Sequence, residues 1–323
     1  MGHGPRSSAK QAQLYERWGE KRDLERVKEA VKRDLHIHKI AAFPSDFLVG
    51  KRSGERVRQV VRTKFHGTCL PEQMKTLPTQ GKILLPLDHL PPDTVPSEMP
   101  PYLMARLEHF LTDAQQAGLL SRWNKLIATD PKHLLKHDAN RSNSEGYHFG
   151  LWEVTASTPR ITRESRDQSD DAKEAIDNLL RFLKSYIANK IGTAFEELAP
   201  DQWKAMLKAN ARVMDLLARE HSARPSLFMG GPFFAVAAKE AGSGVTHIDW
   251  NDDKAVYAFI FAVGDWEGGE FCVPQLGIKI PVRPGQVLCV LARVLAHFSA
   301  PTGTFFGMET QKLLNWRSTT QVV

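Results

Sequence analysis

Short apolar runs separated by turn residues fill the C-terminal third of the sequence, and they restrict the fold more than any other feature. The clearest runs cover residues 227–238, 255–263 and 287–291, and Gly, Pro or Asp stand near their ends. Runs of this length with such boundaries are typical of the buried strands of a sandwich or barrel. We therefore predict a compact β domain over residues 225–323.

Helical spacing of apolar residues dominates the chain before this β domain. One aromatic-rich run interrupts it, and this run predicts a strand over residues 147–154. The spacing itself predicts helices over residues 9–39, 101–128, 171–191 and 201–220. Helices followed by strands are typical of the α+β class.

Proline is frequent between residues 70 and 101, which predicts an irregular surface connection or a linker. We expect this stretch to close a basic, helical N-terminal region over residues 1–100. The rest of the chain, residues 101–323, is then expected to hold the supporting helices and the β domain.

A histidine and an aspartate stand two positions apart in Val-Thr-His-Ile-Asp-Trp-Asn-Asp-Asp, residues 245–253. Side chains alternate along an extended segment, so His247 and Asp249 are expected on the same side. His297, in a later run, is the candidate for a third ligand. Two histidines and one carboxylate, with other coordination positions open, are the facial triad of non-haem Fe(II) oxygenases. We therefore predict a metal site made by these three residues.

Residues 51–64 form a strongly basic segment in a chain whose formal net charge is +6. The segment either contacts a phosphate backbone or forms an exposed edge strand whose charges oppose aggregation. Both interpretations stay open at this stage. The candidate backbone contacts are Lys51, Arg52, Arg56, Arg58, Arg62 and Lys64.

The remaining bulk features concern location. Three scattered cysteines do not make a disulfide framework, which fits a reducing compartment. No apolar run reaches the length of a membrane helix, and the first residues lack the apolar core of a secretory signal. We expect an intracellular protein with no membrane partner.

Four motifs of the C-terminal third resemble those of the Fe(II)/2-oxoglutarate-dependent dioxygenases. They are His-Ile-Asp at 247–249, Gly-Asp-Trp-Glu-Gly-Gly-Glu-Phe at 264–271, Val-Arg-Pro-Gly-Gln-Val-Leu at 282–288, and His-Phe at 297–298. The second and third motifs look most like the TET/JBP-like nucleic-acid-modifying branch, especially its fungal members. The resemblance implies a double-stranded β-helix (jelly-roll, cupin-like) core over about residues 225–323, buttressed by the preceding helices. It also implies Fe(II), 2-oxoglutarate as cosubstrate, and O₂.

Enzymes of this family hold the distal carboxylate of 2-oxoglutarate with a cation on the strand after the last ligand. Arg317-Ser-Thr319 resembles their Arg-x-Ser anchor, with Thr319 as the hydroxyl residue. A guanidinium also binds a carboxylate through two parallel hydrogen bonds, which an ammonium cannot do. The distance from His297 is longer than the usual family spacing, so Lys312 stays an alternative.

The resemblance implies 5-methylcytosine in DNA as substrate, oxidised to 5-hydroxymethylcytosine and further oxidised forms. A base in a duplex must leave the stack to reach an enclosed metal. Asp252 is the candidate acid that accepts from the base's amino group, while Trp250, Phe233 and Phe234 are candidates for stacking or, alternatively, core residues. We expect a nuclear monomer whose partner is methylated DNA, with RNA as an alternative.

Two other functions compete with this interpretation. In the first, the fold and iron chemistry are the same, but the enzyme acts on another methylated base, a protein side chain or a small molecule. In the second, the β domain is a non-catalytic binding module. The presence of all three ligand residues argues against the binding module.

Overall fold

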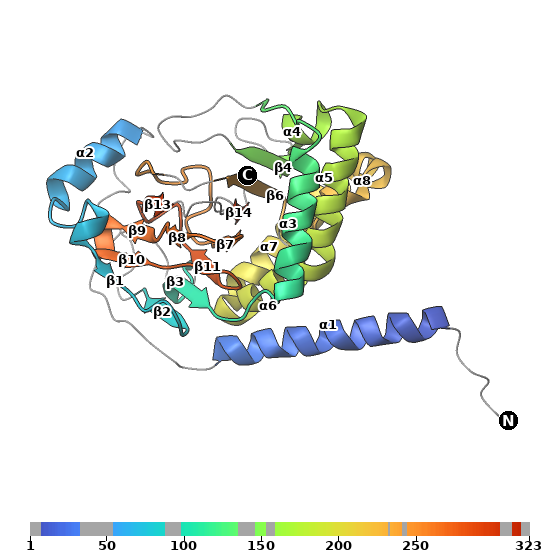
Figure 1. Cartoon of the computed structure of the whole chain (residues 1–323), viewed down its shortest axis with the longest axis horizontal. Helices are drawn as coiled ribbons and strands as arrows, with labels where there is room; N and C mark the ends of the chain where they lie inside the picture. The colour runs from blue at the N-terminus through green and yellow to red at the C-terminus, as the bar shows by residue number, and fades with distance from the viewer. Residues whose placement is uncertain are drawn as a thin grey trace.

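The computed structural model describes residues 8–32, 54–87, 98–134, 146–152, 159–231, 233–240, 244–303 and 312–317. Within these ranges, side chains are described except at residues 8–15, 30–32, 303 and 312–317. Helices cover one face of an eight-stranded sheet, and a four-stranded sheet lies on its other side (Figure 1). The mixed α+β class is thus confirmed.

The eight-stranded sheet has the order β2-β3-β11-β7-β14-β6-β4-β5, with antiparallel pairing throughout. The predicted apolar runs supply β6, β7 and β11, and all six residues of β7 are buried. The predicted aromatic strand is β4. The strands are β2 (Ile83–Pro86), β3 (Tyr102–Leu107), β4 (Tyr147–Trp152), β5 (Arg160–Ile161), β6 (Ala235–Glu240), β7 (Ala258–Val263), β11 (Val287–Val290) and β14 (Lys312–Arg317).

The four-stranded sheet has the order β1-β10-β9-β12, with β1 parallel to β10 and the other pairs antiparallel. β13 and β8 form a separate two-stranded antiparallel sheet. Their bounds are β1 (Lys75–Thr76), β8 (Glu267–Gly268), β9 (Phe271–Val273), β10 (Ile278–Ile280), β12 (Phe298–Ser299) and β13 (Thr302–Gly303). The proline-rich stretch is therefore not wholly irregular, since β1 and β2 join one sheet each.

Gly268, in the Gly-Gly turn between β8 and β9, is a position that favours glycine. Its φ is +74°, a left-handed conformation that a side chain disfavours. A Cβ atom at this position would lie 2.4 Å from the carbonyl oxygen of Pro301, which belongs to the approaching β13 segment. The glycine allows the two chain segments to come this close.

The predicted helix over residues 101–128 is wrong in its first part. Residues 102–107 form β3, whose backbone pairs with β2 on one side and β11 on the other and whose side chains are buried from Leu103 onward. The helix α3 (Asp113–Ile127) begins only after Thr112, whose side chain accepts from the backbone N–H of Gln115 in a capping box. Tertiary pairing thus overrides helical spacing here.

The predicted helices over residues 171–191 and 201–220 are present, with the first extended to Leu198, and of the predicted helix 9–39 residues 33–39 lie outside the described part of the chain. Phe195 of α6 packs on Phe259 of β7, with ring centroids 5.6 Å apart, so the helices cover the face of the sheet that carries Phe259. A π-helical turn, Lys184–Ala188, joins α5 to α6. The bounds are α1 (Ser8–Lys32), α4 (Arg163–Arg166), α5 (Asp170–Leu183), α6 (Asn189–Leu198), α7 (Pro200–Leu216) and α8 (Ala218–Ala223).

Residues 54–64 of the basic segment form a helix, α2 (Gly54–Lys64), so the edge-strand interpretation is wrong for these residues. Val57 and Val61 are buried and stand four residues apart, which places them on one side of the helix. These two valines are the buried side of an otherwise charged helix. Among the described residues, no helix combines the length and apolar character needed to cross a membrane.

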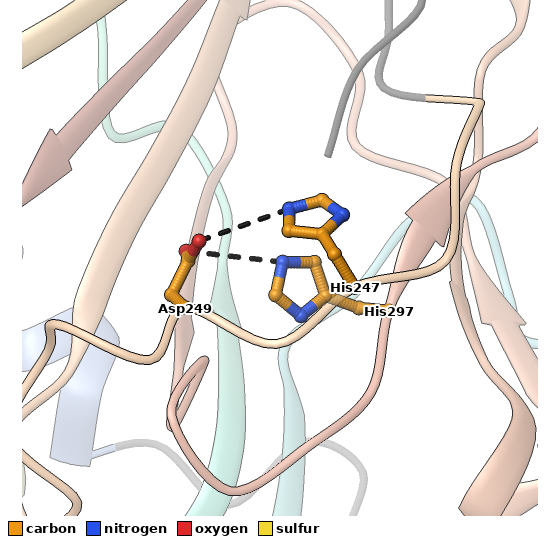
Figure 2. A group of neighbouring side chains, drawn as sticks. All are labelled: His247, Asp249 and His297. Atoms are coloured by element: carbon orange, nitrogen blue, oxygen red, sulfur yellow. Dashed lines mark ion pairs between the residues drawn. The ribbon is translucent and has the colours of Figure 1, made fainter. Parts of the chain in front are cut away.

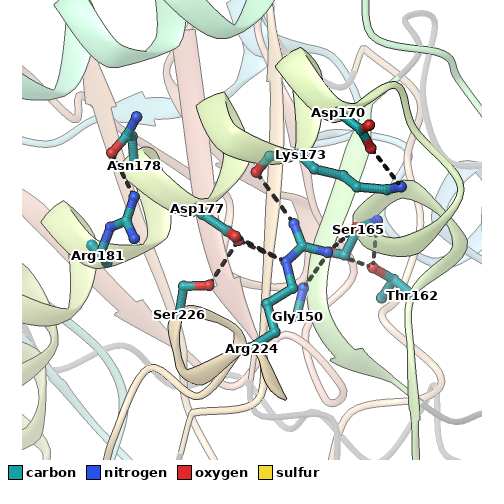
Figure 3. A network of polar contacts seen from close by, with 10 residues as sticks. All are labelled: Gly150, Thr162, Ser165, Asp170, Lys173, Asp177, Asn178, Arg181, Arg224 and Ser226. Carbon is teal, nitrogen blue, oxygen red and sulfur yellow. Dashed lines mark hydrogen bonds and ion pairs between the residues drawn. The ribbon is translucent and has the colours of Figure 1, made fainter. Parts of the chain in front are cut away.

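Arg224 joins the helix layer to the edge of the large sheet (Figure 3). Its Nε lies 2.8 Å from Asp177 Oδ1 of α5, and its guanidinium also donates to the backbone oxygens of Ser165 and Lys173. Ser165 Oγ in turn accepts from the N–H of Gly150 on β4, at 3.0 Å. Bonds to charged donors of this kind contribute more than neutral ones.

Lys190 of α6 fixes the N-terminal helix α1 to the same layer. Its Nζ lies 2.6 Å from Asp23 Oδ2, 2.7 Å from Gln115 Oε1 and 2.8 Å from the carbonyl oxygen of Phe110. Burial lowers the pKa of Lys190, and the Asp23 carboxylate opposes that shift. The three acceptors are therefore what stabilises a charged lysine at this buried position.

Candidate metal centre

The two candidate histidines are paired through their backbones. The N–H of His247 donates to the carbonyl oxygen of His297 at 3.0 Å, and the reverse bond measures 2.9 Å. This isolated antiparallel bridge places the imidazole rings 4.5 Å apart, between centroids, on the same side of the chain. Two backbone bonds thus join residues that are fifty positions apart in the sequence.

A second pair of bonds fixes how each ring is protonated. His247 Nδ1 lies 2.7 Å from the carbonyl oxygen of Val245, and His297 Nδ1 lies 2.9 Å from that of Leu295. A carbonyl oxygen only accepts, so each Nδ1 carries the hydrogen in the neutral ring. The lone pair of each ring is then at Nε2, the arrangement that a metal ligand needs.

Asp249 completes the group, with one carboxylate oxygen toward each ring (Figure 2). Its Oδ1 lies 3.7 Å from His247 Nε2, and its Oδ2 lies 3.9 Å from His297 Nε2. The three ligand atoms fall within 4.8 Å of one another, and all three residues are buried. Within the described part of the chain, this is the single such group of three or more.

The donor set fits one divalent metal ion. Two imidazole nitrogens and one carboxylate oxygen, all on one side, are the facial arrangement that non-haem Fe(II) sites use. Burial of a carboxylate is costly unless a positive charge balances it. A bound cation would supply that charge, and the predicted residues His247, Asp249 and His297 are the ones that would hold it.

The backbone around Asp249 explains its fixed position. Its N–H donates to the carbonyl oxygen of Ala292 at 3.1 Å, which ties it to the segment after β11. Its own carbonyl oxygen accepts from the N–H of Asp252 at 3.0 Å, which closes a turn. Gly244 and Val245 lead into the ligand segment from the end of β6.

Two neighbours that sequence reasoning missed support His297. Phe271 of β9 stacks on its imidazole with ring centroids 5.0 Å apart and an interplanar angle of 19°. Gln275, 5% exposed, accepts from the N–H of Ala296 at 2.6 Å and donates to the carbonyl oxygen of Val294 at 3.4 Å. The sequence gives no sign that this side-chain amide forms two hydrogen bonds with the backbone that precedes His297.

We expect Gln275→Ala to lower the affinity for a divalent metal by about tenfold, the lower end for residues that orient ligands. The N–H of Ala296 would lose its acceptor, and the ligand segment would lose its fixed position. Titration calorimetry with Mn²⁺ measures the change. Gln275→Glu keeps the acceptor oxygen and is expected to retain more affinity than the alanine variant.

Gln286 provides the matched control for this experiment. It is buried too, and it bonds the backbone of Arg283 and Thr79 away from the ligands. Gln286→Ala should therefore reduce stability without changing the metal affinity. Equal metal affinities for the two alanine variants would contradict a positioning role for Gln275.

The predicted substrate residues fall into two groups. Asp252 is 7% exposed and lies in the turn that Asp249 closes, next to the ligands in the chain. Trp250 is half-buried, and the guanidinium of Arg293 covers its ring at 4.5 Å from the centroid. Phe233 and Phe234 are only 1% and 3% exposed.

Phe233 and Phe234 belong to the main hydrophobic core, as the alternative interpretation has it. The ring of Phe233 packs edge-on against Phe259, with centroids 5.8 Å apart. Both side chains are enclosed by protein, so a flipped base would have to displace the core to stack on them.

The two candidate anchors for 2-oxoglutarate lie on β14, where only the backbone is described. Arg317 pairs with Ala235 of β6, and Lys312 pairs with Val263 of β7. Phe259 and Val263 share the helix-covered face, because positions four apart in a strand alternate back to the same side. Lys312 thus occupies a register position of the helix-covered face, and Arg317 one of the opposite face. Thr319 lies outside the described residues.

The predicted backbone contacts lie mostly on α2. Lys51 and Arg52 fall outside the described residues. Arg58 is partly buried and pairs with Glu55 at 2.7 Å. The exposed cations of this helix are Arg56, Arg62 and Lys64.

Comparison with known proteins reveals the fold. The chain is similar to a solved structure described as NgTET1 in complex with 5mC DNA, with a TM-score of 0.51 and 11% identity. The match covers 84% of this chain and 93% of NgTET1. The chain has the fold of NgTET1.

A second solved structure is an oxidoreductase of the 2OG-Fe(II) oxygenase family from Burkholderia pseudomallei. It matches with a TM-score of 0.36 and 11% identity, over 88% of this chain and 96% of that one. No protein-family model matches the sequence, and a search of curated proteins finds no match either.

Proposed function

We propose that the protein is an Fe(II)/2-oxoglutarate-dependent dioxygenase. The observation that carries this proposal is the buried group of His247, Asp249 and His297, whose Nε2 atoms and carboxylate oxygens converge. The NgTET1 fold supports it, and so do the two sheets that face each other, which we interpret as a double-stranded β-helix. Bound iron would supply the oxidising chemistry, using O₂ while 2-oxoglutarate is converted to succinate and CO₂.

The chain's own residues have defined tasks in such a reaction. The carbonyl oxygens of Val245 and Leu295 hold the two imidazoles in the tautomer that presents Nε2. Asp249 is fully buried, so water competes little for the ligand atoms. Arg317 is our proposed anchor for the distal carboxylate of 2-oxoglutarate, since its register position belongs to the sheet face that the helices leave uncovered.

For the substrate, we propose 5-methylcytosine in DNA, oxidised to 5-hydroxymethylcytosine and further products in the nucleus. Support comes from the fold of NgTET1, which was solved with 5mC DNA, and from the net charge of +6. Asp252 is the proposed base-reading acid because it directly follows the ligand segment. A base extruded from the duplex would present its amino group to such a carboxylate.

Mass spectrometry of nucleosides tests this proposal. The protein is incubated with Fe(II), 2-oxoglutarate and a duplex that contains 5-methylcytosine, beside the same duplex without methyl groups. We expect 5-hydroxymethylcytosine from the methylated duplex only, with succinate formed alongside. Succinate without a changed base would retain the enzyme class and refute the substrate, whereas no succinate under any condition would refute the dioxygenase.

A further inference from the structure

The apolar side of α2 contacts both segments that carry the metal ligands. Val57 and Val61, 3% and 2% exposed, form a small hydrophobic cluster with Ile248 and Ala296, separate from the main core. Ile248 stands between the first two ligands in the chain, and Ala296 directly precedes the third. One helix from the N-terminal region thus packs on the residues that are adjacent in the chain to all three ligands.

The chain that follows α2 is fastened to the same side of the molecule. Thr68 Oγ1 donates to the carbonyl oxygen of Pro274 at 2.8 Å. A Cβ atom at Gly277 would lie 2.9 Å from Thr68 Cγ2, so the two segments are in close contact. The pairing of β1 with β10 continues this attachment. The helix is therefore packed at one side and tied at its end, and a shift of α2 would reach the ligand segments.

The outer side of α2 is basic. Arg56, Arg62 and Lys64 are exposed on this side of the helix, and Glu55 is its single acid. Exposed cations on one helix are suited to neighbouring phosphates of a nucleic-acid backbone.

A further cation lies next to this helix. Trp250 packs on the small cluster of α2, and the guanidinium of Arg293 stacks over its ring. Arg293 therefore places a further cation beside the cluster that α2 forms with the ligand segments.

We propose that α2 couples nucleic-acid binding to the metal centre. Its basic side binds backbone phosphates, and its apolar side holds the ligand segments in place, so that each event stabilises the other. This inference rests on the proposed function, because it takes a nucleic acid as the partner. Coupling between two sites is reciprocal, so metal must tighten nucleic-acid binding by the factor by which nucleic acid tightens metal binding.

Titration calorimetry of the full chain with Mn²⁺ tests the coupling, with and without a saturating methylated duplex. We expect the duplex to lower the Kd for Mn²⁺ by about fivefold or more. Mn²⁺ should lower the Kd for the duplex by the same factor.

Two variants separate the two sides of the helix. Arg56→Ala/Arg62→Ala is expected to weaken duplex binding and to reduce its salt-dependence slope by about 2, with the metal affinity of the duplex-free protein unchanged. Val61→Ala is expected to weaken Mn²⁺ binding about tenfold without the duplex and to diminish the coupling.

Matched controls come from α7, which belongs to the helix layer beside α6 (Figure 1). Lys204→Ala/Lys208→Ala removes two exposed cations there and should leave duplex and metal binding unchanged. Val213→Ala removes the same atoms as Val61→Ala from a fully buried site. It should reduce stability but not metal affinity.

The outcomes distinguish this inference from the function on which it rests. If the wild-type protein binds no duplex, the DNA substrate fails together with the coupling. If it binds the duplex but its Mn²⁺ affinity does not change, the coupling alone is refuted. Equal metal affinities for Val61→Ala and Val213→Ala would likewise refute it.

Discussion

Replacing His247 or Asp249 by alanine is expected to abolish metal binding and, with it, succinate formation. Each substitution removes one of three converging ligands, and among the described residues these three form the single group of this kind. Two remaining ligands do not make the facial site that holds Fe(II). The loss should be complete in calorimetry with Mn²⁺ and in the turnover assay.

The stability of these variants gives an independent check. A metal that binds only the folded state stabilises it by about 2.7 kcal/mol at a concentration 100 times its Kd. The wild-type protein should therefore melt at a higher temperature with Mn²⁺, and the two variants should not respond. Without metal, Asp249→Ala should not be less stable than the wild type, because it removes a buried carboxylate.

His221→Ala serves as the control for this experiment. His221 lies on α8 and packs against Phe228, with ring centroids 4.7 Å apart, far along the chain from the ligands. Its removal should leave the metal-induced rise in melting temperature unchanged. A metal response that survives in His247→Ala would contradict the assignment of this residue as a ligand.

The common side of His247 and Asp249 was predictable because it depends on neighbouring residues alone. His247 and Asp249 share a side for the reason that any two alternate residues of an extended segment do. The α+β class was predictable as well, since the apolar runs that became β6, β7 and β11 have the length of buried strands. These properties depend on residues that are close in sequence.

The support of the ligands was not predictable, because it depends on partners that are distant in sequence. Gln275 bonds Ala296 across β10 and β11, and Val61 packs with Ile248 across most of the chain. The same cause explains the error at residues 102–107, where pairing with β11 selects a strand over the helical spacing. From the sequence, Phe233 could equally be a core residue or a residue that stacks on a substrate base, and its burial in the structure distinguishes the two.

Arg317→Ala is expected to raise the KM for 2-oxoglutarate by about 100-fold, and Lys312→Ala to change it by less than about twofold. Loss of a buried cation's contact with a carboxylate costs about 2–5 kcal/mol, and each 1.4 kcal/mol corresponds to a factor of ten. The two positions differ by five residues along β14, which places them on opposite faces of the sheet. Helices cover the face that holds the position of Lys312, since Val263 and Phe259 belong to it.

Steady-state kinetics with varied 2-oxoglutarate measures both variants, and Arg317→Lys adds a chemical test. A lysine keeps the charge but loses the forked geometry, so its KM should fall between those of the wild type and Arg317→Ala. Saturating 2-oxoglutarate should restore much of the turnover in each Arg317 variant, because the metal ligands are intact. If Lys312→Ala instead shows the large increase, the pairing of β14 with β6 and β7 must be shifted by an odd number of residues. Such a shift moves every side chain of the strand to the other face.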